Sequence, residues 1–311
     1  MNTISPFSSY FSVPIQEILT FHEVTLCMKR EDLIHSGISG NKFWKLYHNI
    51  ENYRLKHPSN PFIITFGGAF SNHIVATAYA GKIANIPTLG IIRGEELEAN
   101  FTENPSLALA SSLGMKFQFV SREAYRDKKN IEKGWMAHYP DAIIIPEGGT
   151  NLAAVEGIKN MLNTSTKDFD YLCTAVGTGG TVSGLSKYAE EHQKILGFQV
   201  VEDPSIVQVI HDLSGRDNVQ LFTTEPKGYG KFDEKLIAFI NEFYQKYQIP
   251  LDPIYTGKMM MKLFQLIEND YFVPKTKILA FHTGGIQGVL GANQLLKKKK
   301  KLTIDFNPLQ I

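Results

Sequence analysis

The chain has 311 residues, of which 43% are hydrophobic and 20% charged, a composition that indicates an ordinary globular protein and excludes a disordered one. Its 32 basic and 31 acidic residues nearly cancel, so no overall field favours a nucleic acid or an anionic membrane. The two cysteines stand in apolar runs and are expected to be buried thiols in a reducing compartment rather than a disulfide or metal ligands. Neither a signal peptide nor a membrane-length apolar run is present, which predicts a cytoplasmic protein that binds neither nucleic acid nor membrane.

From about residue 61, short β-rich runs alternate with amphipathic helical runs. The expected strands are 61–66, 88–92, 115–120, 142–145, 171–176, 195–201 and 277–281. The expected helices are 71–84, one opening at 104–106, 153–161, 181–190, 233–247, 258–268 and one from 287 onward. This βαβ series predicts an α/β protein with mostly parallel sheets and helices on both faces.

Two glycine-rich turns follow two of these strands, at the strand ends where α/β proteins bind ligands. The second turn, His282-Thr283-Gly284-Gly285, follows strand 277–281. The first turn follows strand 171–176 and consists of Gly177, Thr178, Gly179, Gly180 and Thr181. Its glycines allow positive φ and close backbone approach, so that N–H groups and threonine hydroxyls can bind a phosphate at the start of the next helix. A turn built for packing alone and a dinucleotide site are the alternatives, although the glycine spacing is not that of a dinucleotide motif.

Lys42 stands in the segment Ser39-Gly40-Asn41-Lys42-Phe43-Trp44-Lys45-Leu46. A lysine that bonds covalently to a carbonyl cofactor needs burial or nearby positive charge, because both lower the pKa of its amine. The apolar neighbours of Lys42 can bury the helix that begins here. Together with the phosphate-binding turn, Lys42 predicts a covalently held pyridoxal 5′-phosphate; the alternative is a solvated lysine at a helix start.

The turn after strand 61–66 presents Ser71, Asn72 and His73 at the start of a helix. A helix N-terminus with a hydroxyl, an amide and an imidazole is suited to binding a substrate carboxylate. Ser71 can also serve simply as the N-cap of that helix, and His73 can be a structural histidine.

Five ordered motifs, covering the chain from about residue 29 to 291, resemble one family. They are Gly40-Asn41-Lys42-x-x-Lys45-Leu46, Gly67-Gly68-x-x-Ser71-Asn72-His73, Gly177-Thr178-Gly179-Gly180-Thr181, Asp252-Pro253-Ile254-Tyr255-Thr256-Gly257-Lys258 and His282-Thr283-Gly284-Gly285. They look like the 1-aminocyclopropane-1-carboxylate deaminase/D-cysteine desulfhydrase family of fold-type II, tryptophan synthase β-like, pyridoxal-phosphate enzymes.

The resemblance implies roles for these residues toward the cofactor. Lys42 would bind it covalently and later move protons at the substrate Cα. Asn72 would bond its phenolic oxygen, residues 177–181 would hold its phosphate, and Thr283 would lie against its pyridine nitrogen. A hydroxyl cannot keep that nitrogen protonated as a carboxylate would, so the ring is a weaker electron sink, which suits elimination.

The resemblance also implies residues that contact the substrate. Ser71 and Asn72 would bind its carboxylate, with His73 and Phe70 in the same turn, and Tyr229 and Tyr255 match active-site tyrosines of the family. Deaminases of the cyclopropane acid carry Glu and Leu at the positions of Thr256 and Thr283, which therefore match the desulfhydrase branch. The chain also departs from both branches at three places. Phe70 stands where the family usually has Gln, and Ile74-Val75 where it usually has Thr-Arg. Phe43-Trp44 replaces a small or apolar residue followed by Arg.

These observations predict a two-domain enzyme, a lyase or deaminase, without a metal. Residues 1–47 and 151–311 would form the large cofactor-binding domain, with 48–150 inserted as the small domain, and the family implies a homodimer. The expected reaction is α,β-elimination on a small amino acid, first D-cysteine, giving pyruvate, ammonia and sulfide. The alternatives are deamination of the cyclopropane acid, dehydration of D-serine, and a protein that binds pyridoxal phosphate without turnover.

Overall fold

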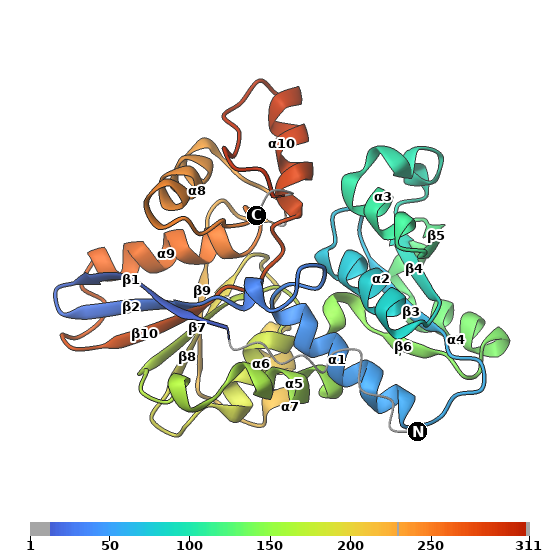
Figure 1. Cartoon of the computed structure of the whole chain (residues 1–311), viewed down its shortest axis with the longest axis horizontal. Helices are drawn as coiled ribbons and strands as arrows, with labels where there is room; N and C mark the ends of the chain where they lie inside the picture. The colour runs from blue at the N-terminus through green and yellow to red at the C-terminus, as the bar shows by residue number, and fades with distance from the viewer. Residues whose placement is uncertain (1–12, 229, 309–311) are drawn as a thin grey trace.

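A computed structural model describes residues 13–228 and 230–308. It contains a six-stranded sheet in the order β1-β2-β10-β7-β8-β9 and a four-stranded sheet in the order β5-β4-β3-β6. Figure 1 shows the large sheet on the left, the small sheet on the right, and helix α1 running from one to the other. The predicted α/β class with two mostly parallel, helix-flanked sheets is confirmed.

The large sheet is parallel except for an antiparallel hairpin at one edge. Its strands are β1 (Ile15–Phe21), β2 (Val24–Lys29), β7 (Tyr171–Val176), β8 (Lys194–Gln199), β9 (Val219–Thr223) and β10 (Lys277–Phe281). Along β10, Ile278 and Ala280 pack into one apolar cluster, whereas Leu279 and Phe281 pack into another. This alternation shows a sheet covered on both faces.

Two groups of helices cover those faces. One cluster contains residues of α1 (Asn41–Arg54), α5 (Leu152–Ile158), α6 (Gly180–Tyr188) and α7 (Ile206–Ser214). The other contains residues of α8 (Glu234–Tyr247), α9 (Thr256–Glu268) and α10 (Gly288–Lys298). Ligand-binding turns between strand ends and helix starts are therefore held on a core that is packed on both sides.

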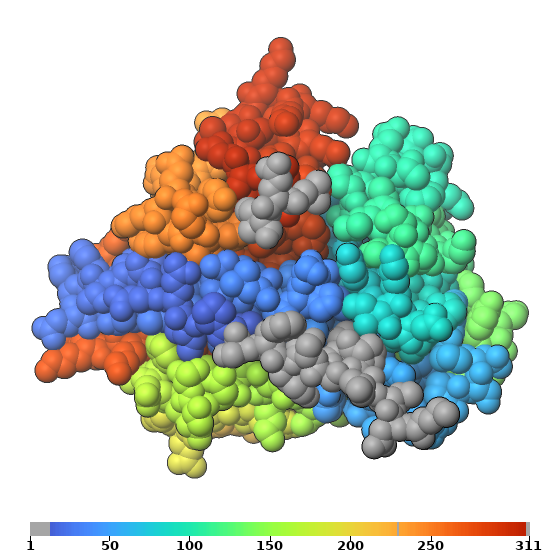
Figure 2. Space-filling model, viewed as in Figure 1, coloured from blue at the N-terminus to red at the C-terminus, as the bar shows by residue number. Residues whose placement is uncertain are grey.

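The small sheet is entirely parallel. Its strands are β3 (Ile63–Gly67), β4 (Thr88–Arg93), β5 (Lys116–Val120) and β6 (Ile143–Ile145), and its helices are α2 (Asn72–Ala84), α3 (Pro105–Ser112) and α4 (Lys128–His138). The Asn104 side chain caps α3 by accepting from the N–H groups of Ser106 and Leu107, each at 3.0 Å. Figure 2 shows α10 (red) beside the helices of the small sheet (green), so the two parts also meet away from α1.

Short 3-10 helices fill several connections. They are η1 (Glu31–Leu33), η2 (Glu95–Glu103), η3 (Ala124–Arg126), η4 (Glu147–Gly149), η5 (Lys159–Met161) and η6 (Thr164–Thr166). The seven strands and seven helices expected from the sequence are confirmed to within a few residues, whereas β1, β2, β9, α4 and α7 were not expected. The domain bounds stay a prediction, and the one between residues 47 and 48 falls inside α1.

Two expectations about the whole chain can be compared with this fold. Both cysteines, Cys27 and Cys173, are free, and Cys173 is buried. Throughout residues 13–228 and 230–308, no helix combines the length and apolar character needed to cross a membrane.

Candidate active site

A cavity of about 410 Å³ lies where the turns of the two sheets meet. Most of the predicted site residues line it together: Lys42, Ser71, Asn72, His73, Gly177, Thr178, Gly179, Gly180, Thr181, Tyr255 and Thr283. The turns that carry them follow the carboxyl ends of β3, β7 and β10, which is where parallel sheets bind ligands. Segments more than 200 residues apart in the sequence thus form one site.

Lys42 is held at the first turn of α1, against both glycine-rich turns. The preceding Gly40 has a φ of 68°, and a Cβ there would overlap the carbonyl oxygen of Thr283. The amine of Lys42 donates to Asn41 Oδ1 at 3.3 Å, and Asn41 Nδ2 donates to Thr181 Oγ1 at 2.7 Å. Glycine at position 40 is therefore required for α1 to start beside Thr283.

Burial changes the charge state of Lys42. It lowers the pKa of this amine from 10.5 to about 8, against the opposing effect of the Asp252 carboxylate, which raises it. Desolvation disfavours the ammonium form. A substantial fraction of Lys42 is consequently a neutral amine near pH 7 to 8, as covalent bonding to a carbonyl group requires.

The turn 177–181 forms a cradle at the start of α6. Gly179 has a φ of 86°, and a Cβ on Gly180 would lie 2.8 Å from Thr150 Oγ1 and 2.9 Å from Lys45 Nζ. Glycine at these positions therefore keeps the space before the helix N-terminus open. Exposed N–H groups and the positive end of the helix dipole make this space suitable for a phosphate.

Lys45 is a site residue to which sequence reasoning gave no role. Its amine lines the cavity and donates to the carbonyl of Gly148 at 3.2 Å. Burial, and then the nearby Lys42, lower its pKa well below the usual range, so a bound anion would favour its charged form. The signal was present, because positions i and i+3 of a helix share a face and Lys45 belongs to the Lys42 motif.

Asn72 and His73 begin α2 and line the cavity, and each has a buried acceptor atom. The buried Oδ1 of Asn72 and Nδ1 of His73 have no hydrogen-bond partner among the residues the structure describes. Thr65 Oγ1 donates to the carbonyl of Ile145 at 2.8 Å, so it accepts from His73 Nε2 at 2.7 Å. His73 is therefore neutral with its proton on Nε2, and burial, followed by the two lysines, lowers its pKa well below the usual range.

Tyr255 and Thr283 complete the wall opposite the small sheet. A Cβ on Gly177 would lie 3.1 Å from the Tyr255 ring, so this ring packs on the turn 177–181. Thr283 is 8% exposed. Thr256, which follows Tyr255, is fully buried and donates to Asp252 Oδ1 at 2.7 Å. It therefore stabilises the start of α9, and it does not belong to the cavity lining.

The ring of Phe70 lies against α10. It does not belong to the cavity lining; a Cβ on Gly291 of α10 would lie 2.8 Å from its ring. The ring packs there because Gly291 leaves room for it, and the expected contact of Phe70 with a substrate stays a prediction. Tyr229 lies outside the described residues. Arg93, at the end of β4, lines the cavity and was not expected.

The site fits pyridoxal phosphate. Lys42 supplies a partly buried amine of lowered pKa, the turn 177–181 and Lys45 supply a phosphate cradle, and the side chain of Asn72 lines the same cavity. Pockets of several hundred Å³ with a few convergent polar groups are typical of cofactor sites. The chain matches the family of pyridoxal-phosphate dependent enzymes over residues 12–284, and it belongs to that family. Pyridoxal 5′-phosphate is its cofactor.

Similar proteins narrow the class. The chain is 30% identical over 303 residues to the mitochondrial bifunctional D-cysteine desulfhydrase/1-aminocyclopropane-1-carboxylate deaminase of Arabidopsis thaliana, covering 85% of this chain and 73% of that protein. It is also 30% identical over 301 residues to a putative 1-aminocyclopropane-1-carboxylate deaminase of Thermotoga maritima, covering 86% and 91%. A solved structure of an ACC deaminase homologue shares the fold, with a TM-score of 0.78 at 24% identity over 95% of this chain and 98% of that one. The family named from the sequence motifs is thereby confirmed.

Proposed function

We propose that the protein catalyses α,β-elimination on a small amino acid, D-cysteine being the first candidate, and releases pyruvate, ammonia and sulfide. The observation that carries the proposal is that one cavity contains both a partly buried amine of lowered pKa, Lys42, and a hydroxyl, Thr283. The relative from Arabidopsis thaliana, whose name includes D-cysteine desulfhydrase, supports this substrate.

Lys42 removes the proton from the substrate Cα and holds it on Nζ. When bound, pyridoxal phosphate withdraws electrons from that carbon. A general base works best when its pKa lies near the operating pH, which is the condition that burial creates for Lys42. The C–S bond then breaks with its electron pair remaining on sulfur.

Thr283 favours elimination because it offers the pyridine nitrogen a hydroxyl rather than a carboxylate. In the described lining of the cavity the carboxylates are Glu147 and Asp203, and both are engaged elsewhere. Glu147 pairs with Lys128 at 3.1 Å, and Asp203 accepts from Ser205 at 2.6 Å. Each of these carboxylates therefore already has a partner of its own.

Ser71 and the N-terminus of α2 bind the substrate carboxylate, and Arg93 adds a positive charge beside them. Arg93 Nη2 lies 3.6 Å from the position of a Cβ on Gly68, and the carbonyl of Gly68 accepts from the Ser71 N–H at 3.1 Å. The guanidinium lies 5.6 Å from the centre of the Tyr125 ring. A cation–π contact does not use the N–H donors, so they can still bind a carboxylate. With Phe70 turned away, Arg93 replaces the amide that the family usually has in this turn.

The test is pyruvate release by the pyridoxal-phosphate-loaded protein from D-cysteine, β-chloro-D-alanine, D-serine and the cyclopropane acid. We expect turnover of the first two and little of the others, because sulfide and chloride leave more readily than hydroxide. Turnover of the cyclopropane acid alone would move the protein to the deaminase branch. Binding of the amino acids without any product would show a protein that binds the cofactor without catalysis.

The proposal also covers the oligomeric state, the compartment and the domain bounds of the protein. We propose a homodimer in the cytoplasm, with residues 48–150 forming a small domain inserted into the large domain of residues 1–47 and 151–311. The measurements are light scattering for the dimer, fractionation for the compartment and limited proteolysis for the domain bounds.

A further inference from the structure

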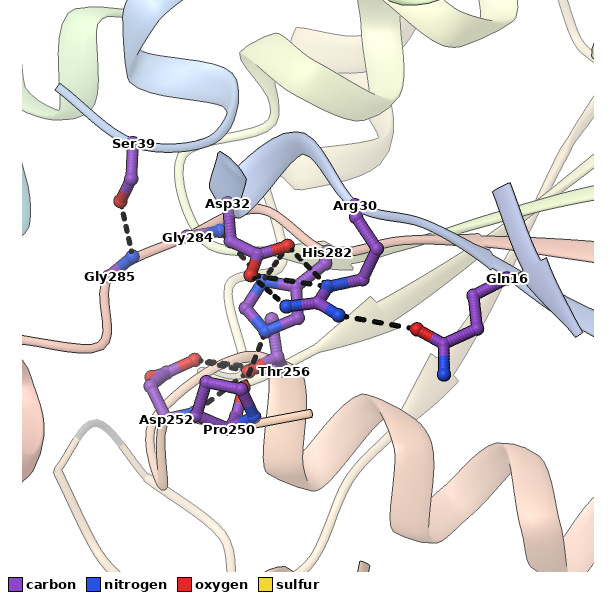
Figure 3. A network of polar contacts seen from close by, with 10 residues as sticks. All are labelled: Gln16, Arg30, Asp32, Ser39, Pro250, Asp252, Thr256, His282, Gly284 and Gly285. Carbon is purple, nitrogen blue, oxygen red and sulfur yellow. Dashed lines mark hydrogen bonds and ion pairs between the residues drawn. The ribbon is translucent and has the colours of Figure 1, made fainter. Parts of the chain in front are cut away.

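A buried polar network that includes Arg30, Asp32, Pro250 and His282 lies next to Gly284 and Gly285 (Figure 3). His282 is its centre, and its side chain is fully buried. Its Nε2 lies 2.6 Å from the carbonyl oxygen of Pro250, and the Gly284 N–H approaches its Nδ1 at 3.2 Å. Asp32 Oδ1 lies 3.6 Å from the same Nδ1. Both ring nitrogens of His282 therefore have polar neighbours within 3.6 Å.

These partners determine where the proton of His282 resides. A carbonyl oxygen can only accept, so Nε2 carries the hydrogen that reaches Pro250. A backbone N–H can only donate, so Nδ1 presents its lone pair to Gly284. Only the neutral Nε2–H form of His282 satisfies both partners, and with Nδ1 unprotonated the contact with Asp32 is not an ion pair.

Arg30 prevents Asp32 from disturbing this arrangement. Its Nε and Nη2 donate to the two carboxylate oxygens at 2.9, 3.2 and 2.7 Å, a bidentate pair that compensates the carboxylate charge. Arg30 is in turn held by Gln16 Oε1 at 3.3 Å. The carboxylate beside His282 is thus already paired and does not draw a proton onto Nδ1.

The hydrogen bond to Gly284 acts on the turn that carries Thr283. Gly284 and Gly285 have φ values of 72° and 88°. Because glycine has no side chain, it can adopt many backbone conformations, and its own preferences do not fix the shape of this turn. The turn is fixed instead by His282 on one side and by Ser39 Oγ, which accepts from the Gly285 N–H at 3.4 Å, on the other. Ser39 directly precedes Gly40, the N-cap of α1, and α1 carries Lys42.

We propose that His282 is a positioning residue: in its neutral Nε2–H form it holds the 283–285 turn, and so sets Thr283 against the cofactor ring at a fixed distance from the Lys42 helix. The proposal rests on the proposed contact of Thr283 with the cofactor. Residues behind the groups that contact a bound group commonly alter its affinity or activity about ten- to a hundredfold when changed.

Two amide substitutions separate the two hydrogen bonds of His282. In His282→Asn the side-chain oxygen takes the place of Nδ1 and accepts from Gly284, but the side chain is too short for Pro250. In His282→Gln the longer amide reaches Pro250 and leaves the Gly284 N–H without its acceptor. The Asn variant is thus the matched control for the loss of the imidazole itself.

The dissociation constant of pyridoxal phosphate, measured by fluorescence titration of the apoprotein, is the main readout, alongside the melting temperature of each apoprotein. We expect His282→Gln to weaken binding about tenfold or more and His282→Asn to change it by less than about threefold. Equal losses in the two variants, or losses that follow the melting temperatures, would show a purely structural histidine and overturn the proposal.

A second measurement covers the case in which a variant does not fold. In ¹⁵N-histidine-labelled wild-type apoprotein, we expect the His282 Nδ1 to show the chemical shift of an unprotonated nitrogen. A proton on Nδ1 in the folded protein would contradict the proposal directly. Because this signal needs neither cofactor nor substrate, it is independent of the proposed reaction.

Discussion

Lys42 is expected to titrate near pH 8 in the apoprotein, and this shift can be tested by changing pH alone. At pH 7 an amine of pKa about 8 is about 9% neutral, whereas an amine of pKa 10.5 is about 0.03% neutral. The ratio predicts that Lys42 reacts with an amine reagent about 300-fold faster than a solvated lysine of equal intrinsic reactivity and access.

The assay is brief labelling of apoprotein with such a reagent between pH 6 and 11, with each lysine quantified by peptide mass spectrometry. Lys187 is the internal reference, because its hydrogen bond to Glu156 raises the pKa of its amine. Labelling of Lys42 should reach half its maximum near pH 8, and that of Lys187 above the ordinary lysine value of 10.5. Asp252→Asn should lower the Lys42 midpoint further, since the Asp252 carboxylate raises it. A Lys42 midpoint as high as that of Lys187 would refute the role assigned to burial.

Three substitutions test other parts of the site. Lys45→Met should weaken pyridoxal phosphate binding about tenfold or more in an equilibrium titration, because a charge-assisted phosphate contact is lost; unchanged affinity would exclude Lys45 from the phosphate site. Arg93→Gln should raise the KM for D-cysteine about tenfold while kcat stays nearly constant; a fall in kcat alone would assign Arg93 to another step. Phe70→Ala should lower the free energy of unfolding by about 1–2 kcal/mol, through loss of packing on Gly291, and leave KM unchanged; a change in KM without a loss of stability would return Phe70 to the substrate site.

The parallel parts of the fold could be predicted because their strands are short apolar runs between glycine turns and helical patterns. Strand 171–176 has the bounds expected from the sequence. The hairpin β1–β2 has partly exposed strands, and so lacks the apolar run that marks a buried strand. The spatial order that places β10 between β2 and β7 depends on long-range packing, which local patterns do not encode.

The site residues likewise include some that the sequence predicts and others that it does not. Lys42, Asn72 and the turn 177–181 belong to glycine-rich segments whose backbone geometry is tied to their sequence, and they converge in the cavity. The packing of Phe70 on Gly291 could not be predicted, because a turn in a sequence does not reveal which way a ring points and Gly291 is more than 200 residues away. Arg93 was missed because a single arginine at a strand end carries no motif of its own.

The most direct test of the central proposal is borohydride reduction of the pyridoxal-phosphate-loaded protein, followed by peptide mapping. We predict that the reduced cofactor is attached to Lys42 and absent from Lys45, three residues along the same helix. Lys42→Ala should abolish both the attachment and the visible-range absorbance of the loaded protein. Attachment at another lysine, or an absorbance band that survives in Lys42→Ala, would contradict the site described for this chain.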